Sequence, residues 1–302
     1  MTVGYKGFKK GLICRDKHYK ENTIFEEPKA ILCETGMHYC RNPLDVMNYY
    51  PMIDENAFPA EYAEVTDLGI SNYEQWLPVD SKVCTNKIKI GNIIPFEDYC
   101  KLCMTDPKFI LDGTAILSDS VHFHNYPDSR GRMFTFSFGM KNIIDNVKKY
   151  CHIATFGNRS TVLNFAESCK LRIENYQGNV LNKGVYSEIL INGDKNTCAN
   201  AGDYNVIRFC GNDNTFSNVG DKCKIFLDGN DNNIGIKGRF NKIICSNPNN
   251  NIKVYTDEVL IKAVKGTKIQ FVDKTTIDLY IENSNKCYTI MKGKLKEIED
   301  FD

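Results

Sequence analysis

Hydrophobic and polar positions recur every nine residues along the second half of the chain. Six glycines between Gly193 and Gly238 stand nine residues apart, and the same frame runs back to Gly139 and forward to Val264. The sixth place of these fourteen nonapeptides carries Ile144, Ile153, Val162, Leu171, Val180, Ile189, Cys198, Ile207, Phe216, Ile225, Ile234, Ile243, Ile252 and Ile261. One apolar position in a short fixed period is typical of a stacked solenoid. The pattern therefore predicts a β-solenoid over residues 139–264.

The eighth place of the nonapeptide alternates between asparagine and an apolar residue, as at Asn164, Ile173, Asn182 and Ile191. This alternation doubles the period to eighteen residues and indicates two nonapeptides per coil, hence seven coils. We expect one strand around the fifth to eighth places and one turn around each glycine, because glycine tolerates positive φ. Asparagines eighteen residues apart are expected to stack and bond from coil to coil, as side-chain amides do in cross-β assemblies.

The remaining segments are interpreted as end-pieces of this array. Short apolar runs at residues 30–33, 63–65 and 87–90 predict strands, and residues 42–50 predict a short helix with Asn42 as its N-cap and Pro43 at its first position. The expected fold class is therefore mainly β: a small α+β head (1–95), a neck and N-terminal cap (96–138), the solenoid (139–264) and a C-terminal β cap (265–302). A charged segment at 296–302 is expected to fray.

Composition narrows the function classes. The chain has 302 residues, with 38 basic and 38 acidic side chains, so its formal charge is zero. This balance argues against direct binding to nucleic acid and against an acidic DNA mimic. No apolar run approaches the roughly 18 residues that span a bilayer, and residues 1–10 lack a signal peptide, so a cytoplasmic location is expected.

Thirteen cysteines are an odd number and fit a disulfide framework poorly. Within the repeat they occupy places where Ser, Asn, Ile or Val stand in other units, so we interpret them as small core residues of a reduced protein. The pair Cys100 and Cys103 has the CxxC spacing but lacks a second pair or a βαβ setting, which favours a packing role.

Two groups of side chains are candidates for metal binding. Cys14, Cys33, His38 and Cys40 have the ligand types of a Cys₃His zinc site; in the alternative interpretation, Cys33 packs on a strand and His38 caps a turn.

His122 and His124 lie on one side of an expected strand at 115–126, but no third ligand is evident in the sequence, which favours a solvent-facing pair. His152 is expected to point outward.

The head carries motifs that resemble a known group of proteins. They are Tyr5-Lys6-Gly7-Phe8, Cys14-Arg15, Leu32-Cys33-Glu34, Gly36-Met37-His38-Tyr39-Cys40, Asn42-Pro43-Leu44-Asp45-Val46 and Tyr49-Tyr50. Together they resemble the N-terminal domain of uncharacterised phage and prophage proteins, and the likeness continues through the repeats to Cys287-Tyr288-Thr289-Ile290 in the tail. The resemblance implies a phage-related origin and no particular activity.

The order of motifs in the head is also similar to ADP-ribosyltransferase-like folds. This second resemblance implies that Tyr5, Lys6 and Gly7 lie on the first NAD-contacting strand and that His38 lies on the second. Such enzymes use an acidic residue late in the domain, whereas residues 83–89 contain none, and Glu97 lies past the strand.

Three function classes follow. The leading hypothesis is a non-catalytic binding protein of phage origin, whose rigid solenoid engages a host protein or ribonucleoprotein, such as a nuclease of bacterial defence. No cofactor is expected under this hypothesis. The first alternative is a head that binds NAD or another nucleotide, or transfers ADP-ribose; the second is an oligomeric virion or structural component.

Overall fold

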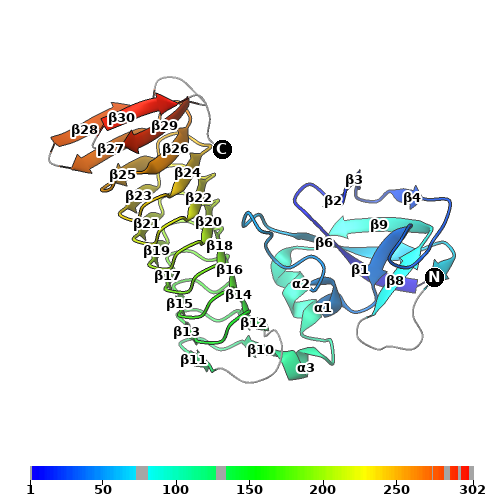
Figure 1. Ribbon diagram of the computed structural model, residues 1–302. Coiled ribbons are helices and arrows are strands. Elements are labelled where there is room, and N and C mark those ends of the chain that lie inside the picture. The colour runs from blue at the N-terminus through cyan, green and yellow to red at the C-terminus, as the bar shows by residue number, and fades with distance from the viewer. Residues whose placement is uncertain are drawn as a thin grey trace. The chain divides into compact units, whose positions relative to one another are not determined.

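The computed structural model describes residues 2–72, 81–126, 134–273, 275–281, 286–291 and 294–298. The chain forms two compact units, one made of residues 1–54 and 58–114 and the other of residues 55–57 and 115–302 (Figure 1). We call these units the head and the solenoid. The expected α+β head and β-solenoid are both confirmed. The head extends past residue 95, because residues 96–114, which we expected in a separate neck, belong to its compact unit.

The head is built on an antiparallel sheet. Its described elements are β1 (Thr2–Phe8), β2 (Ile13–Cys14), β3 (Lys17–His18), β4 (Ile24–Glu26), β5 (Met37–Cys40), α1 (Pro43–Val46), β6 (Glu61–Asp67), β7 (Ser71–Asn72), β8 (Lys82–Thr85), β9 (Lys87–Ile93), α2 (Phe96–Cys103) and α3 (Phe109–Asp112). The described strands of the sheet follow the order β4-β9-β6-β1-β5-β8-β7. Strand β1 therefore lies at the centre of the sheet, which buries its second half.

Two local predictions for the head are wrong. Residues 30–33 form turns and an isolated bridge, not a strand, because Cys33 adopts a left-handed backbone with φ of 65°. Asn42 precedes α1 in an extended conformation but makes no capping hydrogen bond through its side chain. Pro43 does occupy the first position of the helix, but the helix ends at Val46, short of the expected end at residue 50.

The CxxC pair lies in α2, where Cys100 and Cys103 are both buried. The helix is attached to the head through Tyr99. Its ring stacks on Tyr62 with centroids 4.0 Å apart, and its hydroxyl donates a hydrogen bond of 2.7 Å to the carbonyl oxygen of Pro43. These contacts support the packing role that the sequence favoured. All thirteen cysteines lie in the described residues, and none of them forms a disulfide bond there.

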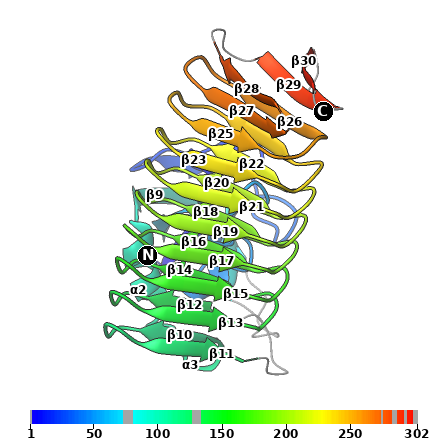
Figure 2. The same cartoon turned by 90° about the vertical axis from the view of Figure 1, so that its left-hand side faces the viewer.

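The solenoid stacks short strands into two parallel ladders (Figure 2). Its described strands are β10 (Gly113–Ile116), β11 (His122–Asn125), β12 (Phe134–Ser137), β13 (Ile143–Asn146), β14 (His152–Thr155), β15 (Thr161–Asn164), β16 (Lys170–Ile173), β17 (Asn179–Asn182), β18 (Glu188–Ile191), β19 (Thr197–Asn200), β20 (Val206–Phe209), β21 (Thr215–Asn218), β22 (Lys224–Leu227), β23 (Asn233–Ile236), β24 (Lys242–Cys245), β25 (Asn251–Val254), β26 (Val259–Ala263), β27 (Lys268–Asp273), β28 (Thr275–Tyr280), β29 (Lys286–Met291) and β30 (Lys294–Ile298). About eight turns run from residue 113 to residue 271, so the coil extends beyond both ends of the nonapeptide frame.

The interior of the solenoid follows the predicted eighteen-residue step. Ile207 pairs with Ile225, and Ile225 pairs with Ile243, in parallel register. All fourteen sixth-place side chains are at most 3% exposed. The eighth-place asparagines form the expected ladder, in which the Nδ2 group of each donates to the Oδ1 atom of the next; the bond from Asn164 to Asn182 is 2.7 Å and that from Asn182 to Asn200 is 2.8 Å.

The turns of the solenoid differ from the prediction. The left-handed conformation belongs to the third place of each nonapeptide, where fourteen non-glycine residues have φ between 55° and 63°. They are Lys141, Tyr150, Arg159, Ser168, Gln177, Tyr186, Lys195, Tyr204, Asp213, Lys222, Asp231, Phe240, Asn249 and Glu258.

The first-place glycines are needed for a different reason. A Cβ atom at Gly229 would overlap the carbonyl oxygen of Gly211 in the preceding coil, and the same close approach recurs at Gly211 and Gly238. Glycine therefore stands where neighbouring coils touch, not where φ is positive.

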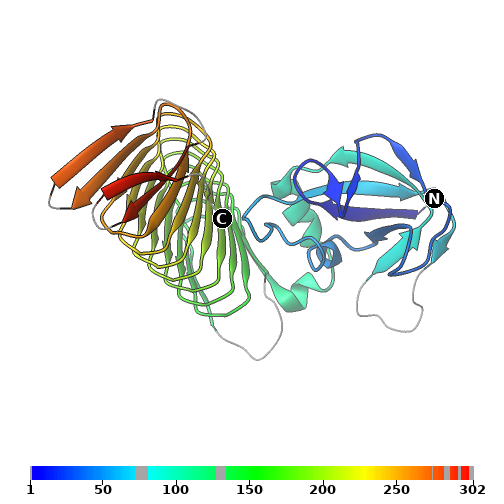
Figure 3. The same ribbon diagram turned by 45° about the horizontal axis from the view of Figure 1, so that its top comes forward.

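The C-terminal end closes the ladders with antiparallel strands, which Figure 3 shows in orange and red. Strand β28 pairs antiparallel with β27, β29 pairs antiparallel with β26, and β30 continues that sheet. The expected C-terminal β cap is present. The charged segment predicted to fray contributes residues 296–298 to β30, and its residues 299–302 lie outside the described part. No helix among the described residues is long and apolar enough to cross a bilayer.

Candidate functional site

The centre of the head sheet carries a buried lysine. Lys6 lies on β1, with its backbone opposite Ala63 of β6, and its neighbour Tyr5 lies opposite Cys40 of β5. Lys6 is only 4% exposed. The next residue is Gly7, where a Cβ atom would lie 2.5 Å from the Cβ atom of Tyr50. The absence of a side chain at Gly7 therefore lets the segment after α1 pack directly over β1.

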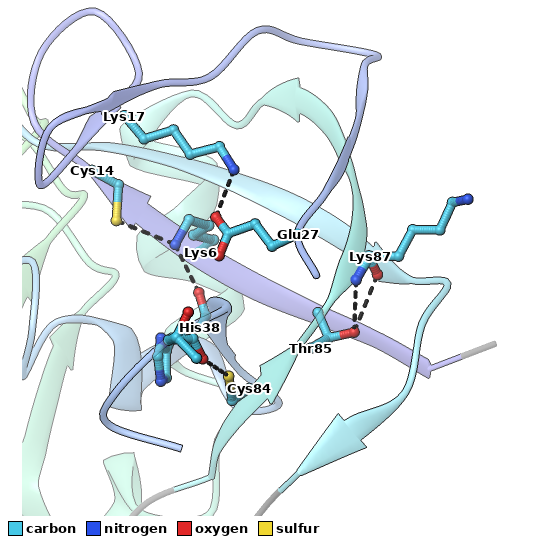
Figure 4. A network of polar contacts seen from close by, with 9 residues as sticks. Lys6, Cys14, Lys17, Glu27, His38, Cys84, Thr85 and Lys87 are labelled. Carbon is cyan, nitrogen blue, oxygen red and sulfur yellow. Dashed lines mark hydrogen bonds and ion pairs between the residues drawn. The ribbon is translucent and has the colours of Figure 1, made fainter. Parts of the chain in front are cut away.

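The ammonium group of Lys6 contacts a backbone carbonyl oxygen and the sulfur of Cys14 (Figure 4). It donates a hydrogen bond of 2.7 Å to the carbonyl oxygen of His38 and lies 3.3 Å from the sulfur of Cys14. It also lies 5.2 Å from the ring centre of Tyr19 and 5.6 Å from that of Phe8. In the described part of the chain, no carboxylate forms an ion pair with Lys6.

Burial is the main cause that lowers the pKa of Lys6 below 10.5, and Cys14 opposes this effect. Because no described carboxylate pairs with the buried amine, an anion bound beside Lys6 would favour its charged form.

Lys6 borders a cavity of about 570 Å³. Its charged lining comes from elements far apart in the sequence: the basic residues are Lys6, Arg15, Lys17 and Lys82, and the acidic residues are Asp16, Glu27 and Glu34. Glu27 is already bonded to Lys17 at 2.7 Å. The aromatic lining is Tyr5, Tyr19, Tyr39, Tyr49 and Tyr50. The cavity thus combines basic groups with flat, apolar rings, which suits a small organic anion.

His38 supports a turn at the edge of this cavity. Its Nε2 atom accepts a hydrogen bond of 3.0 Å from the backbone N–H of Cys33. Burial is the largest cause that lowers the pKa of His38 to about 4, and the charges of Lys82, Lys6 and Arg15 add to it. The imidazole is therefore neutral at physiological pH and keeps its acceptor atom. The interpretation that His38 caps a turn agrees with this contact, whereas Cys33 is exposed rather than packed on a strand.

The four candidate zinc ligands are not brought together. Cys14 accepts a hydrogen bond of 3.0 Å from the hydroxyl of Tyr50, and Cys33 lies 3.3 Å from the ammonium group of Lys82. Cys40 is buried on β5. Among the described residues, one group of three ligand-type side chains does lie within 4.8 Å, and it belongs to the solenoid.

The residues named by the resemblance to ADP-ribosyltransferase-like folds do share one site. Tyr5, Lys6 and Gly7 on β1 and His38 on the neighbouring β5 all line the cavity. The late acidic residue has no counterpart on β8 or β9. Glu97 lies in the first turn of α2, where it forms an ion pair of 2.8 Å with Lys101.

Sequence reasoning missed part of the basic lining. Three further basic residues line the cavity: Arg15 from the turn after β2, Lys17 from β3 and Lys82 from β8. Among these three, only Arg15 stands in one of the quoted motifs, and only the folding of the head brings all three to the cavity beside Lys6.

The prediction for His152 is wrong. We expected its side chain to point outward, but it is 4% exposed in β14, and its ring centre lies 5.0 Å from that of Phe134. Phe134 lies on β12, a strand that precedes the nonapeptide frame. The repeat pattern therefore did not predict that a strand would cover His152.

The fold and the cavity define a two-unit protein, with a pocket in its head and a β-solenoid that follows the head in the chain. Residues 2–102 match the model of a family described as Domain of unknown function (DUF7666). The match covers the sheet of the head and reaches into α2, in agreement with the extent of the compact unit. No curated protein and no solved structure matches the chain.

Proposed function

We propose that this protein acts by binding, and that its head holds a small organic anion in the cavity around Lys6. The observation that carries the proposal is the buried ammonium group of Lys6, which contacts a carbonyl oxygen, a thiol and two rings but no carboxylate among the described residues. An anion placed there would compensate the ammonium group of Lys6 for the hydration that it loses on burial.

A nucleotide-like ligand fits the lining best. A volume of about 570 Å³ lies within the range of about 300–1,000 Å³ that small-molecule sites occupy. Lys6 and Arg15 offer donors to a phosphate, and the rings of Tyr49 and Tyr50 offer apolar surface to a base or a ribose. The second resemblance, which places nucleotide contacts on these same strands, supports the same ligand class.

Binding is favoured over transfer chemistry by the state of the nearby carboxylates. Of the acidic residues that line the cavity, Glu27 is held by Lys17, whereas Asp16 and Glu34 lie exposed on turns. Glu97 is held by Lys101 on a helix that does not line the cavity. Transfer of ADP-ribose requires a carboxylate placed to stabilise positive charge on the ribose. The cavity therefore supports recognition of such a ligand more directly than its turnover.

Calorimetric titration of the full chain with ADP-ribose, NAD, AMP and inorganic phosphate tests this proposal. We expect at least one of the first three to bind, and we expect Lys6→Met to weaken that binding at least about tenfold, since it removes the buried charge. The matched control is Lys89→Met on the exposed face of β9, which should bind as the wild type does.

Circular dichroism and thermal melting show whether each variant folds. A wild-type protein that binds none of the ligands, or a folded Lys6→Met variant with unchanged affinity, contradicts the proposal. Hydrolysis of NAD that Lys6→Ala abolishes would favour the enzymatic alternative instead.

A second proposed role belongs to the solenoid, which we infer presents one edge to a macromolecular partner. The third-place residues of alternate nonapeptides lie on the same edge, because strands pair eighteen residues apart. One edge carries the exposed rings of Tyr150, Tyr186, Tyr204 and Phe240. Tyr186 stacks on Tyr204 with centroids 5.1 Å apart.

The opposite edge presents Lys141, Arg159, Gln177, Lys195, Asp213, Asp231 and Asn249 at the same place. Exposed tyrosines and phenylalanines are typical of protein interfaces, so the aromatic edge is the better candidate surface.

The resemblance to phage proteins suggests a host protein as this partner, bound in the host cytoplasm, where free thiols persist. Capture from phage-infected host extract, quantified by mass spectrometry, tests the idea. We expect a host protein to be retained by the wild type and lost with Tyr186→Ser/Tyr204→Ser. The double change Gln177→Ser/Lys195→Ser on the opposite edge is the control and should retain the partner. Equal retention by both double variants would contradict the role of the aromatic edge.

A further inference from the structure

The first two strands of one solenoid ladder bring two histidines and an aspartate together. His122 and His124 lie on β11 and project to the same side, with ring centres 4.2 Å apart. Strand β13 pairs with β11 in parallel, and its Asp145 lies directly opposite His124. The Oδ2 atom of Asp145 is 2.8 Å from Nε2 of His122 and 2.9 Å from Nδ1 of His124.

We propose that His122, His124 and Asp145 bind a divalent transition-metal ion of the zinc type. The three ligand atoms lie within 4.8 Å of one another. Zinc is held by two histidines and one carboxylate in many sites, with a metal–ligand distance of about 2.0–2.2 Å. Tetrahedral ligands at that distance are about 3.3–3.6 Å apart. The observed contacts of 2.8 and 2.9 Å therefore need to open by less than about 1 Å to admit the ion.

The environment of Asp145 favours a cation. Its Oδ1 atom is buried and accepts no hydrogen bond from any described residue. A carboxylate whose second oxygen is desolvated and unpartnered has much of its charge uncompensated. Both histidines are about half exposed, which leaves room for water at a fourth coordination position.

The group is specific to the start of the solenoid and is not a product of the repeat. The places equivalent to Asp145 in the following coils hold Leu163, Leu181, Ala199, Ser217, Gly235 and Lys253. None of these side chains is a carboxylate, so the stacking of coils does not itself require an acid at this place. A bound ion would join β11 to β13 and stabilise the first coils of the ladder, because binding to a folded site adds to folding stability.

Metal titration of the full chain, with any affinity tag removed, tests the site. Zinc is measured by competition with a chromophoric chelator, and cobalt is measured by its visible absorption, which reports ligand type and geometry. We expect one ion per chain and a cobalt spectrum without a sulfur-to-cobalt charge-transfer band. Asp145→Asn and the pair His122→Ala/His124→Ala should each lower the affinity at least about tenfold.

Two control variants separate this site from the thiols and from surface histidines. His18→Ala removes an exposed histidine on β3 of the head, and Cys33→Ser removes the exposed thiol. Both should retain the wild-type affinity, and zinc should raise the melting temperature of the wild type but not of Asp145→Asn. The proposal is overturned if the wild type binds no ion. It is equally overturned if Cys33→Ser abolishes binding, or if Asp145→Asn and the double histidine variant bind as tightly as the wild type.

Discussion

The two units of this protein bury polar groups in opposite ways. In the solenoid, each buried asparagine of the ladder bonds to the next copy of itself, as from Asn164 to Asn182. In the head, the buried ammonium group of Lys6 rests on a carbonyl oxygen and a thiol. Repetition supplies every residue of the first arrangement with the same partner, whereas the second depends on one pair of neighbours. The comparison separates the self-paired polar groups that stabilise the solenoid from the buried lysine of the head, beside which we propose a ligand site.

The largest effect is expected from a charge placed in the solenoid interior. Ile225 is fully buried between its copies in the adjacent coils. Ile225→Asp should destabilise the array by about 4 kcal/mol, because no partner is available for the buried charge. Urea unfolding followed by circular dichroism measures the loss. Lys224→Asp places the same carboxylate on the exposed side of β22 and should cost far less; equal losses would contradict the buried position of Ile225.

A smaller loss is expected from a methyl group at the contact between coils. Gly229→Ala should lower the free energy of unfolding by about 3 kcal/mol, because the new Cβ atom meets the carbonyl oxygen of Gly211. The same measurement on Gly11→Ala, in the head, is the comparison: there φ is 85° but the space is open, so only backbone strain remains. If Gly229→Ala were harmless, the close approach of the coils would be wrong.

Interruption of the asparagine ladder should cost about 2 kcal/mol. Asn182→Leu removes one of the two acceptors of the Asn164 amide, which keeps the carbonyl of Ala166, and one of the two donors to Oδ1 of Asn200, which keeps the amide of Asn205. Two buried hydrogen bonds of the ladder are therefore lost. Asn179→Leu on the exposed side of the same strand is the matched control and should leave the urea midpoint almost unchanged. Equal stability of Asn182→Leu and Asn179→Leu would mean that the asparagine ladder contributes little to the free energy of unfolding.

In the head, we expect the free energy of unfolding to depend on pH through His38. The unfolded chain protonates His38 below about pH 6.5, whereas the folded protein does so only near pH 4, because burial lowers the pKa of His38. The folded state therefore loses stability as the pH falls from about 6.5 to about 4. His38→Gln should weaken this dependence in urea unfolding, and His18→Gln, at an exposed position, should not. An unchanged pH profile in His38→Gln would exclude this contribution.

The smallest effect should be a gain. Asp231 holds a left-handed backbone with φ of 57°, which costs a non-glycine residue energy. Asp231→Gly should raise the free energy of unfolding by about 0.5–1 kcal/mol relative to Asp231→Ala, which loses the same side chain but keeps the strain. Thermal melting of the two variants compares them directly. Equal melting temperatures would indicate that the turn carries no strain.

The part of the fold that repeats could be read from the sequence. The buried sixth place, the eighteen-residue register and the asparagine ladder are local regularities, and the structure confirms all three. The role of glycine could not be read, because the clash at Gly229 involves a carbonyl oxygen eighteen residues away. The first coils were missed for a related reason: strands such as β12, which contains Phe134, precede the glycine frame.

For the candidate site, resemblance located residues that physical patterns did not. Tyr5, Lys6 and His38 were singled out by motif, and they line one cavity. The burial of Lys6, and the lack of a carboxylate partner for it among the described residues, depend on how β1, β2 and β5 pack, which no periodicity reports. Asp145 was missed for the same kind of reason, since only the pairing of β11 with β13 places it beside the two histidines.

The constant register of the solenoid has a consequence for how the gene can change. Every coil between the first strands and the antiparallel end presents the same backbone edge above and below. Duplicating or deleting fifty-four nucleotides at a coil boundary would therefore insert or remove one complete coil. The strands on either side of the change would still pair in the same register. Relatives of this protein should accordingly differ in length by whole multiples of eighteen codons, whereas any other step would break the alternation of asparagine and apolar residues.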